Sequence, residues 1–343
     1  MNRDEIFMQR CIELASLGIG LTYPNPMVGS VVVYNGSIIG EGWHQKAGGN
    51  HAEVNAILAV KDTSLLKNST LYVNLEPCSH HGKTPPCVDF IIKHKIPRVV
   101  IGCVDPFALV FGKGIDMLKN AGKEVIVGVL EKECRYLNKR FFTFQEKKRP
   151  YIILKWAQSK NGFIAPMKQE FSKPFWITNK KSQILSHKWR TEESAILVGT
   201  NTAEKDNPSL TARLWEGKNP LRLVIDRQLR LKKMLNIFDG NSQTFVFTDK
   251  IKSSTKYISY IKLKFDCLPS EIINALFQKN IQSVIVEGGN KTIQSFIDLN
   301  LWDEARVFTA DIIIKNGVKS PKLNAKPINS IIVDDNQLHY FYK

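Results

Sequence analysis

The first half of the chain alternates between helical and strand-like spacing of its apolar residues. Apolar positions recur every three to four residues over 4–17, whereas 28–34 is rich in β-branched residues and ends at Asn35-Gly36, a favoured two-residue hairpin turn. Further strand-like runs occupy 70–75, 98–104 and 124–129, the partner strand of the hairpin lies near Ile38, and helical patterns begin at His51, Pro86, Gly114 and Glu131. This alternation predicts helices packed on both faces of a mixed sheet.

The second half shows the same alternation. Strand-like runs occupy 151–155, 195–198, 222–226, 244–248 and 283–287, and helical patterns cover 179–191, 270–278 and 291–300. Two short runs, 330–333 and 338–342, lie on either side of Asp334-Asp335-Asn336 and predict a closing hairpin. The second half is therefore also predicted to be α/β.

A charged run that ends in proline lies between the two halves. Residues 145–150 follow the apolar stretch 141–144, and a polar run of this kind is typical of a linker. We therefore expect one domain over 1–146 and a second over 147–343. A chain of 343 residues is long enough for two domains that each bury a core.

The composition is that of an ordinary globular protein, with 43% hydrophobic and 23% charged residues, which excludes the disordered and collagen-like classes. No apolar run approaches the roughly 18 residues that cross a bilayer. The first residues carry acids and lack the apolar core of a signal peptide. Six scattered cysteines are typical of a reduced compartment and of metal ligands. We expect a soluble, cytoplasmic protein.

The net charge of +16 is unevenly distributed along the chain. Residues 1–146 contain 16 basic and 14 acidic residues, whereas 147–343 contain 32 and 18. The excess consists mostly of single lysines between apolar segments, without the basic stripe and interleaved aromatics of a nucleic-acid binder. Two interpretations stay open: a lysine-rich solvated surface, or a basic pocket for phosphorylated small molecules.

One histidine and two cysteines of the first half form a candidate zinc site. His51-Ala52-Glu53 opens a helical pattern, Cys78 follows Pro77 after a strand-like run, and Cys87 lies at the next helical pattern. One imidazole and two thiolates leave the fourth tetrahedral position of zinc open for water, and a glutamate two residues after the histidine suits a proton shuttle. His-x-Glu followed by Pro-Cys is typical of zinc deaminases. A closed site with His80 or His81 as fourth ligand is the alternative.

Eight residues separate the two cysteines, where zinc deaminases generally have two. This insertion, together with residues 24–29 (Pro-Asn-Pro-Met-Val-Gly) and 76–87 (Glu-Pro-Cys-Ser-His-His-Gly-Lys-Thr-Pro-Pro-Cys), closely resembles the bifunctional deaminase–reductase family of riboflavin biosynthesis. The resemblance covers essentially the whole chain. It implies an N-terminal cytidine-deaminase-like α/β/α sandwich that carries out hydrolytic deamination of 2,5-diamino-6-(5-phosphoribosylamino)pyrimidin-4(3H)-one with zinc-activated hydroxide.

The resemblance also implies the roles of individual residues in the first half. One zinc ion per chain would be held by His51, Cys78 and Cys87, with Glu53 as the catalytic proton shuttle. The implied substrate-binding residues are Asn25, His44, Lys83 and Asp105. Two alternatives are that Asn25 only caps a turn and that Lys83 is simply solvated. At Phe107 the family has asparagine, so one polar contact is missing here.

Three segments of the second half resemble the C-terminal reductase domain of the same family: 176–178, 195–213 and 286–289. The last is a glycine-rich turn before a helical pattern, which presents backbone N–H groups to an anion, although a tight turn explains it equally well. The resemblance implies a dihydrofolate-reductase-like α/β domain that uses NADPH. The implied cofactor-binding residues are Ala157, Trp176, Thr202, Asp206, Gly289, Asn290, Lys291 and Thr292. The implied substrate-binding residues are Lys155, Arg190, Leu210, Arg213 and Glu287.

The sequence thus favours an enzyme with two activities, the second reducing the ribosyl chain to give 5-amino-6-(5-phosphoribitylamino)uracil. We expect small-molecule phosphoribosyl pyrimidines as partners, no nucleic acid, no membrane, and a homo-oligomer. One alternative is a nucleic-acid-editing deaminase, which the near-neutral first half disfavours. Another is a deaminase with a degraded reductase scaffold, since Phe107 and Pro174 depart from the family pattern, and Asp206 could merely start a turn.

Overall fold

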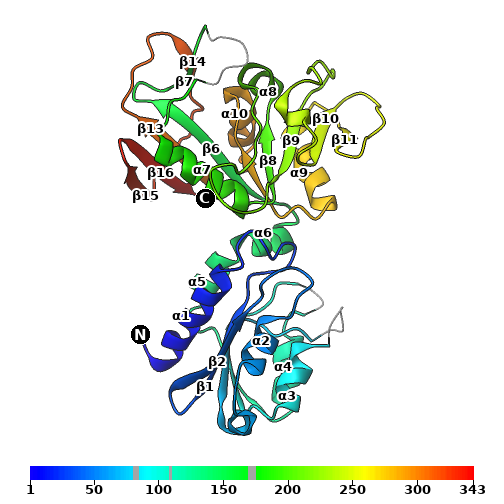
Figure 1. The fold of residues 1–343 in the computed structure, drawn as a ribbon, viewed down its shortest axis with the longest axis vertical. Helices are drawn as coiled ribbons and strands as arrows, with labels where there is room; N and C mark the ends of the chain where they lie inside the picture. Colours follow the sequence, from blue (N-terminus) through cyan, green and yellow to red (C-terminus); the bar gives the residue numbers. More distant parts are fainter. Residues whose placement is uncertain (80–84, 108–109, 169–174) are drawn as a thin grey trace. The chain divides into compact units, whose positions relative to one another are not determined.

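The computed structural model describes residues 1–79, 85–107, 110–168 and 175–343. They form two compact units, Met1–Lys148 and Arg149–Lys343, each built around its own sheet (Figure 1). In these ranges no helix has both the length and the apolar character needed to cross a membrane.

A five-stranded mixed sheet forms the centre of the first unit. Its strands are β1 (Gly29–Tyr34), β2 (Ser37–Trp43), β3 (Thr70–Leu75), β4 (Arg98–Cys103) and β5 (Glu124–Val127), in the order β2-β1-β3-β4-β5. Strand β1 is antiparallel to both of its neighbours, whereas β3, β4 and β5 are parallel. Asn35 and Gly36 form the β1–β2 turn with positive φ of 46° and 81°, which confirms the predicted hairpin.

Helices cover both faces of this sheet, as the sequence predicts. They are α1 (Arg3–Ser16), α2 (Ala52–Leu58), α3 (Cys87–Lys93), α4 (Lys113–Asn120), α5 (Glu131–Leu137) and α6 (Lys139–Lys147), with a 3₁₀ helix at Thr63–Asn68. Alternate residues of β1 point to opposite faces: Val32 packs with α2, α3 and α4, whereas Val31 and Val33 pack with α1, α5 and α6. The unit is thus an α/β/α sandwich.

Gly29 allows α1 to lie directly against the start of β1. A Cβ atom at this position would lie 2.1 Å from the carbonyl oxygen of Cys11 and 2.7 Å from the backbone nitrogen of Ala15. Gly29→Ala is therefore expected to lower the free energy of unfolding by about 1–3 kcal/mol, because the helix backbone must move. Urea denaturation of the whole chain measures this. Gly49→Ala, whose Cβ would approach nothing closer than 3.2 Å, is the control, and equal midpoints for both variants would contradict the packing argument.

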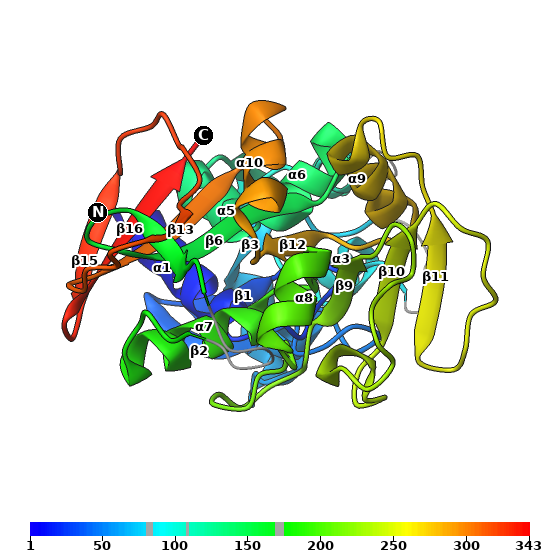
Figure 2. The same ribbon diagram turned by 90° about the horizontal axis from the view of Figure 1, so that it is seen from above.

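The second unit contains a nine-stranded sheet in the order β11-β10-β9-β8-β12-β6-β13-β16-β15, which Figure 2 shows from edge to edge. The strands are β6 (Tyr151–Ser159), β8 (Ala195–Val198), β9 (Leu221–Ile225), β10 (Thr244–Thr248), β11 (Ile258–Lys262), β12 (Ser283–Val286), β13 (Glu304–Ala310), β15 (Asn329–Val333) and β16 (Asn336–Tyr342). Neighbours are parallel from β11 to β13, and β13, β16 and β15 are antiparallel. A separate pair joins β7 (Phe163–Pro166) and β14 (Gly317–Lys319).

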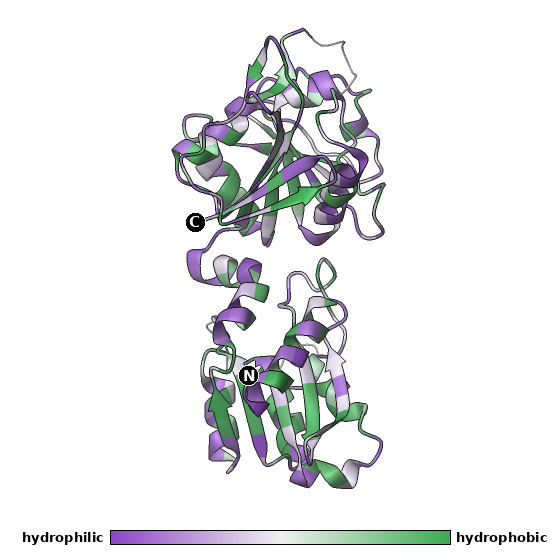
Figure 3. Cartoon of the chain, turned by 90° about the vertical axis from the view of Figure 1, so that its left-hand side faces the viewer, coloured by the Kyte–Doolittle hydropathy of each residue, from purple (hydrophilic) through white to green (hydrophobic). Residues whose placement is uncertain are grey.

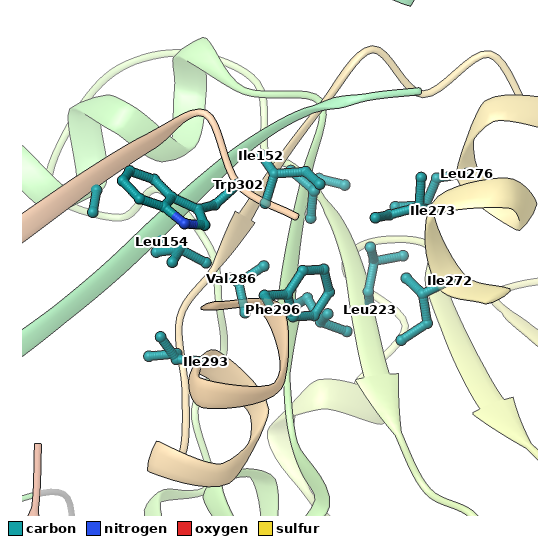
Figure 4. Packing of buried hydrophobic residues seen from close by; sticks show 14 of the residues in the cluster. Ile152, Leu154, Leu223, Ile272, Ile273, Leu276, Val286, Ile293, Phe296 and Trp302 are labelled. Atoms are coloured by element: carbon teal, nitrogen blue, oxygen red, sulfur yellow. The ribbon is translucent and has the colours of Figure 1, made fainter. Parts of the chain in front are cut away.

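Helices also cover both faces of this longer sheet. They are α7 (Lys180–Glu192), α8 (Thr200–Asp206), α9 (Leu268–Gln278) and α10 (Asn290–Asp298), and a 3₁₀ helix spans Asn236–Phe238. Leu154 and Val286 pack under Phe296 of α10, while α9 covers Leu223 (Figure 4). On the opposite face Ile153 packs with Trp189 of α7. Hydrophobic residues follow the strands of both units, as Figure 3 shows, so each unit has its own core.

Several parts of the structure differ from the sequence expectation, which also lacked α8, β7, β11 and β14. Residues 145–147 are the last turn of α6 and not a linker, because Phe141, Phe142 and Phe144 bury one face of this helix in the first unit. The units divide after Lys148, where the sequence analysis placed the boundary after residue 146. The central strand β13 was not predicted, because its charged residues obscure the strand pattern.

Candidate active sites

The three candidate zinc ligands converge from separate elements of the first unit. His51 is the N-cap of α2, Cys78 follows β3, and Cys87 is the first residue of α3. The Nδ1 atom of His51 lies 3.2 Å from Sγ of Cys87 and 3.4 Å from Sγ of Cys78. Tetrahedral zinc with ordinary bond lengths would place such atoms about 3.6 Å apart. Among the described residues these three are the one group of three or more candidate metal ligands whose ligand atoms all lie within 4.8 Å of one another, and they fit zinc.

Glu53 lies in the first turn of α2 with its side chain buried beside the ligands. Burial raises the pKa of this carboxyl group to about 7, partly offset by the positive charge of His51. A carboxyl group with a pKa near neutrality can both accept and return a proton.

His80 and His81, the alternative fourth ligands, lie outside the described residues, as does Lys83, so their roles stay predictions.

His44 lies beside His51, and Asn25 contacts His44. Asn25 Nδ2 lies 3.0 Å from His44 Nε2, and His44 Nδ1 lies 2.9 Å from the carbonyl oxygen of Asn50. The imidazole of His44 meets that of His51 edge to face at 5.5 Å. Burial lowers the pKa of His44, so its ring is neutral at neutral pH. The side chain of Asn25 therefore has a specific partner, beyond the turn that its backbone closes with Thr22.

Asp105 is held near the site by Glu76, for which the sequence predicted no role. The buried carboxylate of Glu76 accepts backbone hydrogen bonds at 2.9–3.4 Å from Asp105, Gly112, Gly114 and Ile115. Asp105 in turn accepts the N–H of Phe107 at 2.8 Å. Burial raises the pKa of Asp105 to about 7, with a smaller contribution from the nearby charges of Glu76 and Cys78 and an opposing one from the hydrogen bond of the Phe107 N–H. Glu76 thus fixes the loop that carries Asp105.

Two buried asparagines hold the turn that carries Asn25, and the sequence analysis missed both. Asn138 accepts the N–H of Met27 at 2.8 Å and donates to its carbonyl oxygen at 2.8 Å. Asn74 donates to the same carbonyl oxygen at 3.1 Å and accepts the N–H of Gly29 at 2.8 Å. Asn74 lies inside strand β3 and Asn138 lies at the junction of α5 and α6. A polar residue at such a position is the one sequence signal that could have indicated a structural role for these two asparagines.

In the second unit, three of the predicted substrate-binding residues form a partly buried ionic cluster. Glu287, just after β12, accepts hydrogen bonds from Lys155 of β6 at 2.5 Å and from Arg190 of α7 at 2.9 Å. Burial alone would raise the pKa of Glu287, but the charges of Arg190 and Lys155 outweigh it and lower the pKa to about 2. In the part of the chain that the structure describes, the buried Nε of Arg190 has no hydrogen-bond partner. An anionic ligand would satisfy it.

Arg213 and Leu210 lie in the segment that follows α8. Arg190 donates to the carbonyl oxygen of Thr211 at 3.1 Å, and burial together with Arg190 lowers the pKa of Arg213. His187, one turn before Arg190 on α7, accepts the N–H of Leu214 at 3.3 Å. Burial and the nearby Arg190 and Arg213 lower the pKa of His187 to about 4. His187 lies three residues before Arg190 on the same helix, so the two side chains share one face, but this spacing alone assigns the imidazole no role. Leu210 is buried in the core beneath this segment.

Three of the predicted cofactor-binding residues meet where α8 and α10 begin. A Cβ atom on Gly289 would lie 3.2 Å from Oγ1 of Thr202 and 3.8 Å from Oγ1 of Thr292. Strands β8 and β12 are parallel neighbours. The chain continues from β8 to β9 on one side of this pair and from β12 to β13 on the other side. In α/β folds, nucleotides bind where the strand order reverses in this way.

The other predicted cofactor residues lie at separate positions in the second unit. Asp206 ends α8 one turn after Thr202, which does not exclude the alternative that it only starts a turn. Ala157 lies on β6 two residues after Lys155. Asn290 Nδ2 donates to the carbonyl oxygen of Lys319, and Lys291 and Trp176 are exposed. Pro174 lies outside the described residues.

Two known families match the chain. The cytidine and deoxycytidylate deaminase zinc-binding region matches residues 1–103, and the RibD C-terminal domain matches residues 150–321. The fold and the converging ligands therefore define a zinc-dependent deaminase joined to a reductase.

Relatives of similar length share both halves. Over 95% of its length the chain is 42% identical to riboflavin biosynthesis protein RibD of Aquifex aeolicus (strain VF5), of which 92% is covered. Identity to RibD of Bacillus amyloliquefaciens is 40% over 93% of this chain and 87% of that protein. The crystal structure of a diaminohydroxyphosphoribosylaminopyrimidine deaminase/5-amino-6-(5-phosphoribosylamino)uracil reductase from Thermotoga maritima matches with a TM-score of 0.90 and 39% identity, over 99% of this chain and 98% of that one. The chain belongs to the RibD family, the bifunctional deaminase–reductases of riboflavin biosynthesis, which confirms the resemblance seen in its sequence. Its cofactors are zinc in the first unit and NADPH in the second.

Proposed function

We propose that the first unit deaminates 2,5-diamino-6-(5-phosphoribosylamino)pyrimidin-4(3H)-one and that the second reduces the product to 5-amino-6-(5-phosphoribitylamino)uracil. The observation that carries this proposal is the convergence of three zinc ligands with the buried Glu53. The description of the Thermotoga maritima relative names both activities. The ionic cluster of Lys155, Arg190 and Glu287 supports the second activity.

In the deaminase unit, His51 would hold zinc through Nδ1 and the two cysteines through their thiolates. Bound zinc supplies water that is activated for hydrolytic attack at neutral pH. The carboxylate of Glu53 takes up the proton of the attacking water and passes it to the ring nitrogen. It then takes the proton of the hydroxyl group on the attacked carbon, which becomes the carbonyl, and delivers it to the amino group that leaves as ammonia. Asn25 binds the pyrimidine edge, and Asp105 faces the ribose.

In the reductase unit, bound NADPH would supply a hydride for C1′ of the ribosyl group, whose bond to the ring oxygen breaks as that oxygen takes up a proton from water. The backbone N–H groups at the start of α10 and the hydroxyls of Thr202 and Thr292 favour the phosphates of the cofactor. The ionised Glu287 orients Lys155 and Arg190 toward the sugar phosphate. Arg190 keeps its Nε–H available for a phosphate or hydroxyl oxygen.

The alternative functions give different results in one assay. Ammonia release is measured on the purified protein with the aminopyrimidine, and NADPH oxidation is followed in parallel. We expect NADPH oxidation only after deamination. Deamination without NADPH oxidation would indicate a degraded reductase, against which the Lys155–Glu287–Arg190 cluster argues. Membership of the family removes the nucleic-acid-editing alternative.

Arg213 provides a test of the substrate phosphate site. Arg213→Ala is expected to raise the KM for the deaminated phosphoribosyl substrate about 10–150-fold, because a charge-assisted bidentate bond is worth about 1.5–3 kcal/mol. The KM for NADPH should stay nearly constant. The control is joint neutralisation of the exposed Lys232 and Lys233, which should change neither constant. Equal effects of both changes in NADPH-oxidation kinetics would indicate a diffuse basic surface and not a phosphate pocket.

The small-molecule substrates follow from membership of the family. Action in the cytoplasm and assembly into a homo-oligomer stay predictions from the sequence. Light scattering on the protein as it elutes from a size-exclusion column measures the number of chains in the assembly directly.

A further inference from the structure

A chain of two hydrogen bonds links the backbone to Asn25 through the imidazole of His44. His44 Nδ1 faces the carbonyl oxygen of Asn50 at 2.9 Å, and His44 Nε2 faces Nδ2 of Asn25 at 3.0 Å. The side chain of His44 is 3% exposed, whereas that of Asn25 is partly exposed. Both ring nitrogens of His44 are therefore engaged within the protein, and neither is available to a substrate.

The direction of these two bonds fixes which atom Asn25 offers. A carbonyl oxygen can only accept, so Nδ1 of His44 must carry the proton. Nε2 of the neutral ring is then an acceptor, and it requires the amide NH₂ of Asn25 as donor. The amide oxygen Oδ1 of Asn25 is left as the atom for an external partner.

We propose that His44 is a positioning residue that acts through Asn25 and does not bind the substrate itself. It holds the amide so that Asn25 presents an acceptor, and the pocket thereby selects a pyrimidine edge that carries an N–H donor. Asn74 and Asn138 fix the backbone of the same turn at Met27, so only the amide rotation of Asn25 is left for His44 to set. The proposal rests on the proposed deaminase function, and it differs from the direct substrate contact that the family resemblance implies for His44.

The test is a double-mutant cycle on substrate binding in a chain whose turnover is slowed. In a Glu53→Gln background, the Kd of the aminopyrimidine is measured by calorimetry for His44→Phe, Asn25→Ala and the combination. We expect each single change to raise the Kd by about 5–50-fold, as for a lost buried hydrogen bond, and the double change to raise it no further than Asn25→Ala. If the Kd of the double variant rose by the product of the two single fold-changes, His44 would bind the substrate directly and the proposal would be overturned. An unchanged Kd for Asn25→Ala would overturn it as well.

A conservative variant separates positioning from a loss of fold. His44→Gln places an amide oxygen near the position of Nε2 and can still accept from Asn25, so it is expected to restore most of the affinity. Zinc content and NADPH-dependent reduction should stay at parent levels in every variant that is scored. If His44→Gln binds no better than His44→Phe, the proposal fails. Absence of ammonia release by the parent chain would instead count against the proposed function, so the two failures are distinguishable.

Discussion

Replacing Glu53 with glutamine is expected to lower kcat for ammonia release by about 10²–10⁴-fold, the usual contribution of a general acid–base group. The amide has almost the same shape but can neither take up nor return a proton. Burial raises the pKa of the native carboxyl group to about 7, which suits it to both transfers. Ammonia release under saturating substrate measures the effect.

Two controls accompany this variant. Its zinc content should equal that of the parent, because Glu53 lies outside the group of three ligands, and the reductase activity should persist because the second unit has a separate core. Glu133→Gln, at an exposed position of α5, should leave deamination unchanged. If Glu53→Gln released ammonia within a few-fold of the parent rate, another residue would have to carry the protons.

The second large effect is expected on the zinc content of the first unit. Cys87→Ala is expected to reduce the zinc content from one ion per chain to nearly none after dialysis, and deamination should be lost with it. The change removes the Cys87 sulfur, which lies 3.2 Å from Nδ1 of His51. Only two of the three protein ligands are then left to bind zinc. Elemental analysis of the purified protein measures the content.

Cys267→Ala is the matched control, since this thiol is exposed in the other unit and should not affect zinc. Reductase activity of the Cys87→Ala variant reports whether the second unit is still folded. Full zinc retention after Cys87→Ala would show that the metal is held by a different set of residues.

Local patterns explain why most of the fold and the zinc site could be predicted. Hydrophobic spacing is repeated within each helix or strand, so α1, β1 and the hairpin at Asn35 follow from a few neighbouring residues. The ligands also belong to short motifs, because His51 opens a helix and Cys78 ends a strand segment. One histidine and two cysteines as ligands already indicate a zinc enzyme before any contact in the structure is known.

Residues whose partners lie far away in the sequence could not be predicted. Asn138 bonds the backbone of Met27 across more than a hundred positions, and no local pattern indicates such a contact. In β13, Glu304 and Arg306 are buried and paired with each other at 2.6 Å, although their charges suggest an exposed segment. His187 was missed because an imidazole on a helix has no fixed role until its charged neighbours are known.

The bonds between Asn138 and Met27 decide how short an independent deaminase fragment can be. Asn138 lies at the junction of α5 and α6, after every strand of its sheet has already been formed by earlier residues. A fragment trimmed after β5 would keep all three zinc ligands, yet both backbone groups of Met27 would lose their Asn138 partner. The turn that presents Asn25 would then depend on Asn74 alone. A fragment that keeps both Met27 bonds must therefore extend at least through Asn138, where α6 begins.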